Sequence, residues 1–299
     1  MIDTKRFVED GRLSRAVLGM DGQELTRLHE SFKPALMHVR QHSRTDRVNR
    51  MGAGRPGGLP TSLDKLVFIL MYCKLYPTMD VMGFLWGLNR SQACRWVHKL
   101  LPVLEKALGR AAALPKRHIR SVEEFFQTFP GAKDIFVDGT ERPRQRPKAT
   151  KARAKTYSGK KKQTTRKIIV ITDENKRIGF LSSSKSGRRH DKKLLDKSGV
   201  ARHIPEAITV WADTGFQGLQ HQHPNTMMPK KSRKNRPLSP EQKQENKVIS
   251  AIRVTVEHSI AGIKRLACMA HAYRNRKANT DDRLAEVSCG LWNFHLQTA

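Results

Sequence analysis

The change in hydrophobic pattern at Pro115 limits what this chain can fold into more than any other feature of its sequence. Before Pro115, apolar residues recur at helical spacing, as Leu25, Leu28 and Phe32 do. After it, short runs rich in β-branched and aromatic residues, such as residues 135–137, lead into turn residues. The pattern predicts an all-α region followed by a domain of the α+β class.

The positive charge of the chain indicates the kind of partner that it binds. Its 299 residues include 57 Lys and Arg against 27 Asp and Glu, a net charge of +30. Hydrophobic residues make up 38%, which is enough for a core, so general disorder is excluded. A polyanion offsets a surplus of this size, and nucleic acid is favoured over an anionic membrane surface.

Apolar runs and cysteines bear on the cellular compartment. The longest apolar run, residues 66–72, is too short to span a bilayer, and no signal segment opens the chain. Four widely separated cysteines without a CxxC pair favour a reducing cytosol. We expect a cytoplasmic protein with no membrane partner.

Residues 59–110 have the outline of a helix-turn-helix. A short helix over residues 79–86 precedes a turn at residues 87–89 and a helix that Ser91 caps and that ends at Leu101. An ordinary helical hairpin with a solvated basic face is the alternative, and the overall charge favours DNA binding. The side chains expected to reach bases and phosphates are Arg90, Gln92, Arg95, His98 and Lys99.

Three parts are expected along the chain. Residues 1–58 form a helical arm and a basic, glycine-containing linker, residues 59–110 the DNA-binding domain, and residues 111–299 a catalytic domain that includes C-terminal helices. In the last part, strands over residues 167–172 and 177–183 form a hairpin, and a helical stretch from His190 and Asp191 precedes a strand over residues 208–212.

Two of the predicted strands end in an aspartate that a glycine follows within two residues. Asp138 precedes Gly139, and Asp213 precedes Gly215. A carboxylate at such a strand end lies at the rim of a sheet, and the small residue leaves room for a ligand. Each aspartate taken singly is also explained as a turn signal.

A long helix supplies a third carboxylate, Glu257. Ser239, Pro240 and Gln242 mark its start as a capping box, and it runs to about Ala267. One polar line borders its apolar stripe, because its members fall within about 40° of one another on a helical wheel. They are Asn246, Arg253, Glu257 and Lys264.

Three carboxylates suit phosphodiester chemistry. Two divalent cations roughly 3.5–4 Å apart activate water and stabilise the leaving oxygen at a scissile phosphate. Mg²⁺ prefers carboxylate oxygens, and Mn²⁺ is expected to substitute. An ordinary surface ion pair is the alternative for Glu257. Together with the helix-turn-helix and the charge, the three residues favour a metal site.

Several motifs in order make this chain similar to one family. It resembles bacterial insertion-sequence transposases of the DDE superfamily, in the IS-five-like branch related to Harbinger elements. Arg253, Glu257 and Lys264 fit the signature Y-x2-R-x3-E-x6-K, with Ser250 at the tyrosine position. The other motifs are residues 91–97, 137–140, 157–160, 190–191, 212–218 and 291–294.

The resemblance implies an RNase H-like core, a mixed five-stranded sheet with flanking helices. It places Asp138 on the first strand, Asp213 at the end of the fourth and Glu257 on a following helix, where they bind two Mg²⁺. The implied reaction is hydrolysis at the element ends followed by attack of the freed 3′-hydroxyl on target DNA. No nucleotide cofactor is expected, since the chain has no Walker motif.

Other residues have expected supporting roles. Arg253, Lys264, Asn246, His190 and Asp191 position phosphates, with Asp191 shaping the site rather than binding metal. Histidines 221, 223 and 258 lack ligand spacing and are not taken as a zinc set. Two basic runs flank the catalytic strands and are expected to contact the DNA backbone, although solvated charge explains them too: Lys160, Lys161, Lys162, Lys230, Lys231 and Arg233.

The partner is therefore expected to be double-stranded DNA, at the element ends and at the target. Two ends to be joined favour a homodimer on DNA, in a bacterial cytoplasm and associated with the nucleoid. A non-catalytic DNA-binding regulator derived from a transposase and a metal-dependent nuclease are the alternative functions.

Overall fold

The computed structural model describes residues 2–42, 58–232 and 237–298, and within them the chain forms two compact units. The helical unit groups Met1–Leu114 with Lys264–His271 and Arg276–Ala299. The sheet unit consists of Pro115–Ile263 and Ala272–Asn275. Most of the predicted linker, at residues 43–57, lies outside the described residues.

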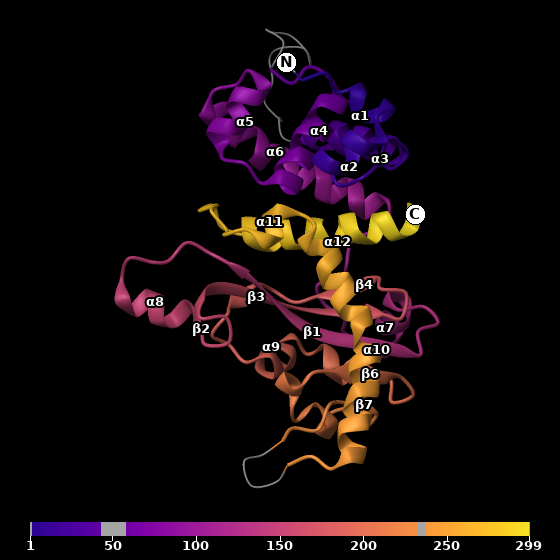
Figure 1. The fold of residues 1–299 in the computed structure, drawn as a ribbon. Helices are drawn as coiled ribbons and strands as arrows, with labels where there is room; N and C mark the ends of the chain where they lie inside the picture. The colour runs from indigo at the N-terminus through magenta and orange to yellow at the C-terminus, as the bar shows by residue number, and fades with distance from the viewer. Residues whose placement is uncertain (1, 43–57, 233–236, 299) are drawn as a thin grey trace. The chain divides into compact units, whose positions relative to one another are not determined.

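The helical unit is built around one helix, α6. It packs against α3, α4, α5 and α12, and α11 packs against α4 and α12. The C-terminal helices thus pack within this unit, whereas the sequence grouped them with the catalytic domain; the expected domain boundaries stay a prediction. The elements are α1 (Arg6–Glu9), α2 (Gly11–Val17), α3 (Gly22–His42), α4 (Ser62–Leu75), α5 (Met79–Trp86), α6 (Arg90–Arg110), α11 (Ala267–Ala270) and α12 (Thr280–Thr298) (Figure 1).

The start and end of α6 differ from the prediction. Asn89, not Ser91, is the N-cap, because its side chain accepts from the Gln92 N–H at 2.8 Å and Gln92 Oε1 accepts from the Asn89 N–H at 3.0 Å. The helix also continues past Leu101 through Pro102, since the apolar stripe that packs on its neighbours goes on to Leu108.

The sheet unit contains one mixed sheet. Its order is β2-β3-β1-β6-β7, and β4 and β5 also pair with β3. Strand β3 runs antiparallel to β1, while β6 is parallel to β1 and β7 parallel to β6. The strands are β1 (Asp134–Pro143), β2 (Tyr157–Ser158), β3 (Gln163–Asp173), β4 (Ile178–Leu181), β5 (Lys185–Ser186), β6 (Thr209–Ala212) and β7 (Thr226–Met227).

This topology confirms the expected RNase H-like core. Strands β4, β3, β1, β6 and β7 make the five-stranded sheet, and in the described residues the two-residue strands β2 and β5 are added along β3. The predicted hairpin is confirmed as β3 and β4. Strand β1 does not end at Asp138, because β3 pairs with it as far as Pro143.

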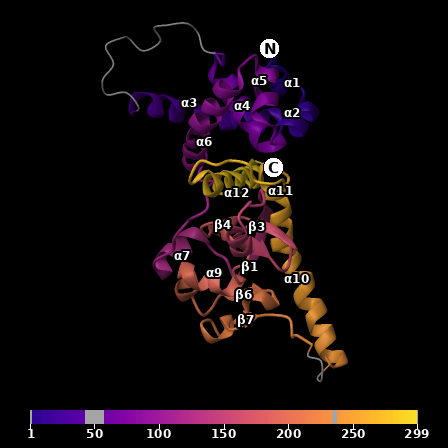
Figure 2. The same cartoon turned by 90° about the vertical axis from the view of Figure 1, so that its left-hand side faces the viewer.

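Helices cover both faces of the sheet. Helix α10 (Pro240–Lys264) lies along one face, and α7 (Val122–Thr128) and α9 (Asp191–Ser198) cover the other (Figures 1 and 2). The predicted capping box of α10 is confirmed, with Ser239 and Gln242 exchanging hydrogen bonds of 3.2 Å. Alternate residues of β1 and β3, such as Val137 and Ile169, join the core under α7 and α9.

A further helix lies between β1 and β2, in a segment rich in basic residues. Helix α8 (Thr150–Thr156) follows β1 and buries none of its residues. Short 3₁₀ turns, at Val200–His203, Thr214–Phe216 and Leu219–His221, connect the elements around β6.

Candidate active site

Asp138 and Asp213 are neighbours across two parallel strands. The pairing of β1 with β6 ends at Val137 opposite Ala212, and the two aspartates come directly after this last pair. Each carboxylate accepts a hydrogen bond of 2.6 Å from a following glycine, Asp138 Oδ1 from the Gly139 N–H and Asp213 Oδ1 from the Gly215 N–H. The local backbone therefore orients both side chains.

Two cations face this pair. Arg253 on α10 places Nη2 3.6 Å from Asp138 Oδ2, and Lys160 places Nζ 3.8 Å from Asp213 Oδ2. Arg253 is buried, whereas the Lys160 side chain is exposed to solvent. The buried Nε of Arg253 has no hydrogen-bond partner within the described part of the chain, so a donor beside the carboxylates is left to bind something else.

The surroundings of Asp138 favour its protonated form. Burial, together with the charge of Asp213, raises the pKa of Asp138 to about 6. The Gly139 N–H and the charges of Arg253 and Lys160 act in the opposite direction and offset only part of that increase. Additional positive charge bound next to Asp138 would therefore stabilise its ionised form.

Glu257 lies one helical turn beyond Arg253 on α10, and its side chain is exposed. The described residues contain no group of three His, Cys, Asp or Glu side chains that could hold a metal ion. The structure thus brings together two of the three predicted carboxylates, and the role of Glu257 stays a prediction.

The predicted phosphate-positioning residues lie in different surroundings. Asn246 holds the chain before α10, since its side chain accepts from the Lys230 N–H at 2.8 Å and donates to the Lys230 carbonyl at 2.9 Å. Lys264 is the last residue of α10 and belongs to the helical unit. His190 is exposed at the start of α9, and Asp191 next to it is buried.

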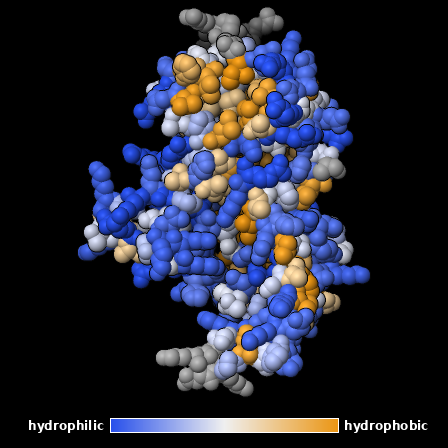
Figure 3. All heavy atoms as spheres, in the orientation of Figure 1, coloured by the Kyte–Doolittle hydropathy of each residue, from blue (hydrophilic) through white to orange (hydrophobic). Residues whose placement is uncertain are grey.

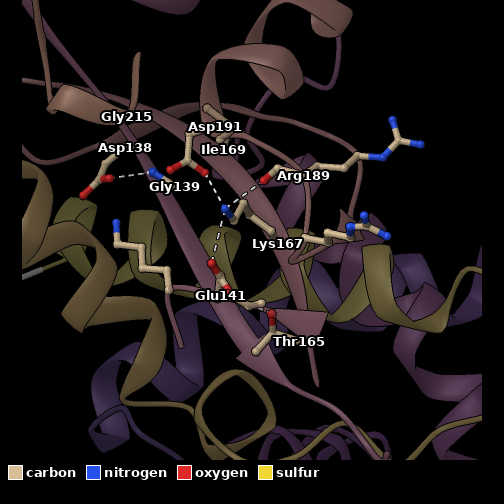
Figure 4. Close-up of polar contacts among 12 residues, drawn as sticks. Asp138, Gly139, Glu141, Thr165, Lys167, Ile169, Arg189, Asp191 and Gly215 are labelled. Carbon is tan, nitrogen blue, oxygen red and sulfur yellow. Dashed lines mark hydrogen bonds and ion pairs between the residues drawn. The ribbon is translucent and has the colours of Figure 1, made fainter. Parts of the chain in front are cut away.

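A second set of charges lies under the same part of the sheet (Figure 4). The Lys167 ammonium is 2.7 Å from Asp191 Oδ1 and 3.2 Å from Glu141 Oε1, and it donates to the Arg189 carbonyl at 3.0 Å. Thr165 Oγ1 donates to Glu141 Oε2 at 2.5 Å. Lys167 and Glu141 were not among the predicted site residues. The sequence could have indicated them, because each is a charged residue at a strand position whose side chain points to the same face as the buried apolar residues.

Comparison with known proteins decides the family. Residues 137–293 match the family described as DDE superfamily endonuclease, and residues 58–110 match the helix-turn-helix of DDE superfamily endonuclease. A probable transposase for insertion sequence element IS702, from Microchaete diplosiphon, is 31% identical over 245 residues, covering 81% of this chain and 84% of that protein. The chain belongs to the DDE superfamily of insertion-sequence transposases. No solved structure matches this transposase.

The match over residues 58–110 confirms the helix-turn-helix of the transposase. Gly87 ends α5 with a positive φ of 61°, a left-handed conformation that suits glycine and turns the chain toward α6. Along α6, Arg90 and Arg95 are exposed, and Gln92 serves the helix cap. Burial, with Lys277 nearby, lowers the pKa of His98.

Of the basic runs predicted to contact DNA, Lys160 is the member with a contact to the aspartate pair among the described residues. Lys160, Lys161, Lys162 and Lys231 are exposed, Lys230 pairs with Glu245 at 2.5 Å, and Arg233 lies outside the described residues. Figure 3 shows mostly hydrophilic side chains over α8 as well.

Two further findings concern metals and membranes. The buried His223 contacts the Pro205 carbonyl at 3.0 Å, and His221 and His258 are exposed. Among the described helices, none has the length and apolar character needed to cross a membrane.

Proposed function

We propose that this transposase cleaves DNA at the terminal inverted repeats of an insertion sequence and joins the freed 3′ ends to target DNA. The observation that carries the proposal is the pair of carboxylates on neighbouring strands, Asp138 and Asp213, each held by a glycine N–H. Membership of a DDE endonuclease family and a net charge of +30 support DNA as the substrate.

The donor set fits a divalent cation. Members of this superfamily generally use divalent metal ions, and two adjacent carboxylates with hard oxygen donors suit Mg²⁺, or Mn²⁺ in its place. We infer that Asp138 and Asp213, with Glu257 from α10, hold two Mg²⁺. When bound, such ions activate water and stabilise the leaving oxygen at the scissile phosphate.

The cationic side chains beside the pair hold the substrate in this proposal. The guanidinium of Arg253 reaches Asp138 through Nη2, and its Nε has no partner within the described residues, so we infer that this group binds a phosphate oxygen. Lys160 is exposed at the rim and neutralises phosphate charge as the DNA approaches. Lys264 and His190 remain candidates for more distant backbone contacts, whereas Asn246 is assigned to holding the loop at Lys230.

The recognition of DNA ends is assigned to α6. Its exposed Arg90 and Arg95 are of the types that contact base edges and phosphates. Because two element ends are joined in one event, we infer that two copies of the chain act together on DNA. The site of action is the bacterial nucleoid in the cytoplasm, where that DNA lies.

A specific observation favours a second candidate, a non-catalytic DNA-binding regulator derived from a transposase. Glu257 is exposed and forms no metal-binding group with the two aspartates in the described residues. A regulator would keep the binding of element ends without needing the third carboxylate.

The test is cleavage of a DNA fragment that carries the element's own end, with and without Mg²⁺, by the wild type and Asp213→Ala. We expect specific nicking that requires Mg²⁺ and falls by at least about a thousandfold in the variant, with DNA affinity unchanged. The matched control is Asp196→Ala, which removes an exposed carboxylate paired with Lys192 on α9.

The outcomes separate the candidates. Binding without cleavage by the wild type would favour the regulator. Cleavage without joining of the 3′ ends to a second DNA would leave a metal-dependent nuclease. Loss of binding in Asp213→Ala, with the fold intact, would contradict a purely catalytic role for Asp213.

A further inference from the structure

The charged residues under the sheet surround one ammonium. Lys167 has three N–H donors, and the three oxygens around it belong to Asp191, Glu141 and the Arg189 backbone, at 2.7, 3.2 and 3.0 Å. The side chains of Lys167, Glu141 and Asp191 are 6%, 4% and 10% exposed. Charges this deeply buried persist only when they are paired and hydrogen-bonded.

This cluster lies on the opposite face of β1 from Asp138. Successive side chains along a strand point to opposite faces, so Asp138 points to one face and a Cβ at Gly139 would point to the other. That Cβ would lie 2.9 Å from Asp191 Oδ1 and 3.3 Å from Ile169 Cδ1. Asp191 therefore packs against Gly139 from the face that carries Ile169, as Figure 4 shows.

Asp191 reaches the second catalytic strand in the same way. A Cβ at Gly215 would lie 3.0 Å from Asp191 Oδ2. Gly139 and Gly215 are the two residues whose N–H groups orient the carboxylates of Asp138 and Asp213. One carboxylate thus packs against both peptide segments that orient the catalytic pair, and a side chain at either glycine would crowd it.

We propose that Lys167, by fixing Asp191 against Gly139 and Gly215, positions the two aspartates that hold the divalent metal, an inference that rests on the proposed function. Lys167 and Asp191 are positioning residues here. Of the two Asp191 oxygens, Oδ1 is 2.7 Å from the ammonium and Oδ2 lies on the side of Gly215. Glu141, anchored by Thr165, holds the ammonium from the other side.

The test uses two variants of the full chain and a control. Lys167→Met removes the charge while keeping the length of the side chain, and Asp191→Asn keeps the shape while removing the negative charge. The control is Asp173→Asn, which changes a buried carboxylate at the other end of β3, where Asp173 accepts from the Arg177 N–H.

Two quantities are measured in each protein. The first is Mn²⁺ binding without DNA, followed by the electron paramagnetic resonance signal of free Mn²⁺. The second is single-turnover cleavage of end DNA over a range of Mn²⁺ concentrations. We expect Lys167→Met to bind Mn²⁺ about tenfold more weakly and Asp191→Asn by a smaller factor, as for other residues that orient metal ligands. Excess Mn²⁺ restores cleavage, and DNA affinity and the control remain as in the wild type.

Several results would overturn the proposal. Wild-type Mn²⁺ affinity in both variants means that the cluster only packs the sheet. A complete loss of Mn²⁺ binding by a folded Asp191→Asn makes Asp191 a ligand. Should Lys167→Met fail to fold, Asp191→Asn decides the question alone. If the wild type binds no Mn²⁺, the proposal that Lys167 and Asp191 position metal ligands is overturned. If it binds Mn²⁺ but does not cleave DNA, only the proposed function is overturned.

Discussion

Asp138 is a carboxylate whose side chain is 18% exposed, with the charge of Asp213 next to it. Arg253 and the Gly139 N–H stabilise its charged form, but burial dominates and the pKa stays at about 6. In the unfolded chain the pKa returns to 3.8. Near neutral pH, ionised Asp138 is therefore less stable in the metal-free folded protein than in the unfolded chain.

We predict that Asp138→Asn stabilises the metal-free protein at pH 8. Because the folded pKa lies above the unfolded one, the stability that wild-type Asp138 contributes is fully present below pH 3.8 and is lost as the pH rises through about 6. At pH 8 the ionised Asp138 lowers the free energy of unfolding of the wild type by about 3 kcal/mol. Urea unfolding at pH 8 and pH 4.5 measures it, and the advantage of the variant shrinks at the lower pH.

The comparison of the two proteins at each pH isolates this one group, since the remaining carboxylates titrate in both. Asp196→Asn, at an exposed position, is the control. An Asp138→Asn variant that is less stable than the wild type at pH 8 would contradict the prediction and would mean that the ion pair with Arg253 outweighs burial.

At the scale of the elements, burial of side chains does not explain the presence of α8. It buries no residue, and it carries basic side chains without an acidic one. Two hydrogen bonds to its carbonyls help to attach it to the sheet unit, from Ser186 Oγ to Lys155 at 2.6 Å and from Arg188 Nη1 to Ala154 at 3.4 Å. A basic helix in that setting is suited to the DNA backbone.

We predict that Lys151→Gln with Lys155→Gln weakens DNA binding without changing stability. Each phosphate contact that is lost reduces the slope of log affinity against log salt by about 0.9, so that two contacts reduce it by about 1.8. Fluorescence anisotropy of end DNA between about 50 and 200 mM salt measures the slope. The matched control is Lys193→Gln with Lys197→Gln, two lysines of α9. Equal slopes in the two double variants would count against α8.

At the scale of the whole molecule, chain order and packing order differ. Helix α12 comes after the catalytic strands in the chain, yet it packs against α6 within the helical unit. It buries a long apolar face there, including Leu284, Leu291 and Phe294. The N-terminal helices therefore depend on the C-terminal helix for part of their core.

We predict that Leu284→Ala destabilises the helical unit selectively. Leu284 is fully buried, and such a truncation costs about 2–5 kcal/mol. Amide hydrogen exchange followed by mass spectrometry would show faster exchange in α6 than in β3. Phe129→Ala, in the core of the sheet unit, is the control and gives the reverse pattern. Equal acceleration in both units would contradict the division into two units.

Local patterns in the sequence were sufficient for the class of the fold and for the strand that carries each aspartate. The run of β-branched residues at 168–172, the capping box at Ser239 and the glycines after Asp138 and Asp213 depend on neighbours in the chain. Such local patterns predict the structure correctly because the geometry of a strand or a helix is set by residues that are close in the chain. The family motifs extended the prediction to a helix-turn-helix and an RNase H-like sheet.

Contacts between distant segments were decided only by the tertiary structure. Glu141 meets Lys167 because β1 and β3 pair in the register that sets those residues opposite each other. Asp191 joins them from α9, and α12 joins α6 from the far end of the chain. The sequence shows that a charged residue lies on the buried face of a strand. Which residue it pairs with depends on strand register and on the position of the helix. Those are properties of the folded chain as a whole, so the aspartates were found from the sequence and the cluster beneath them was not.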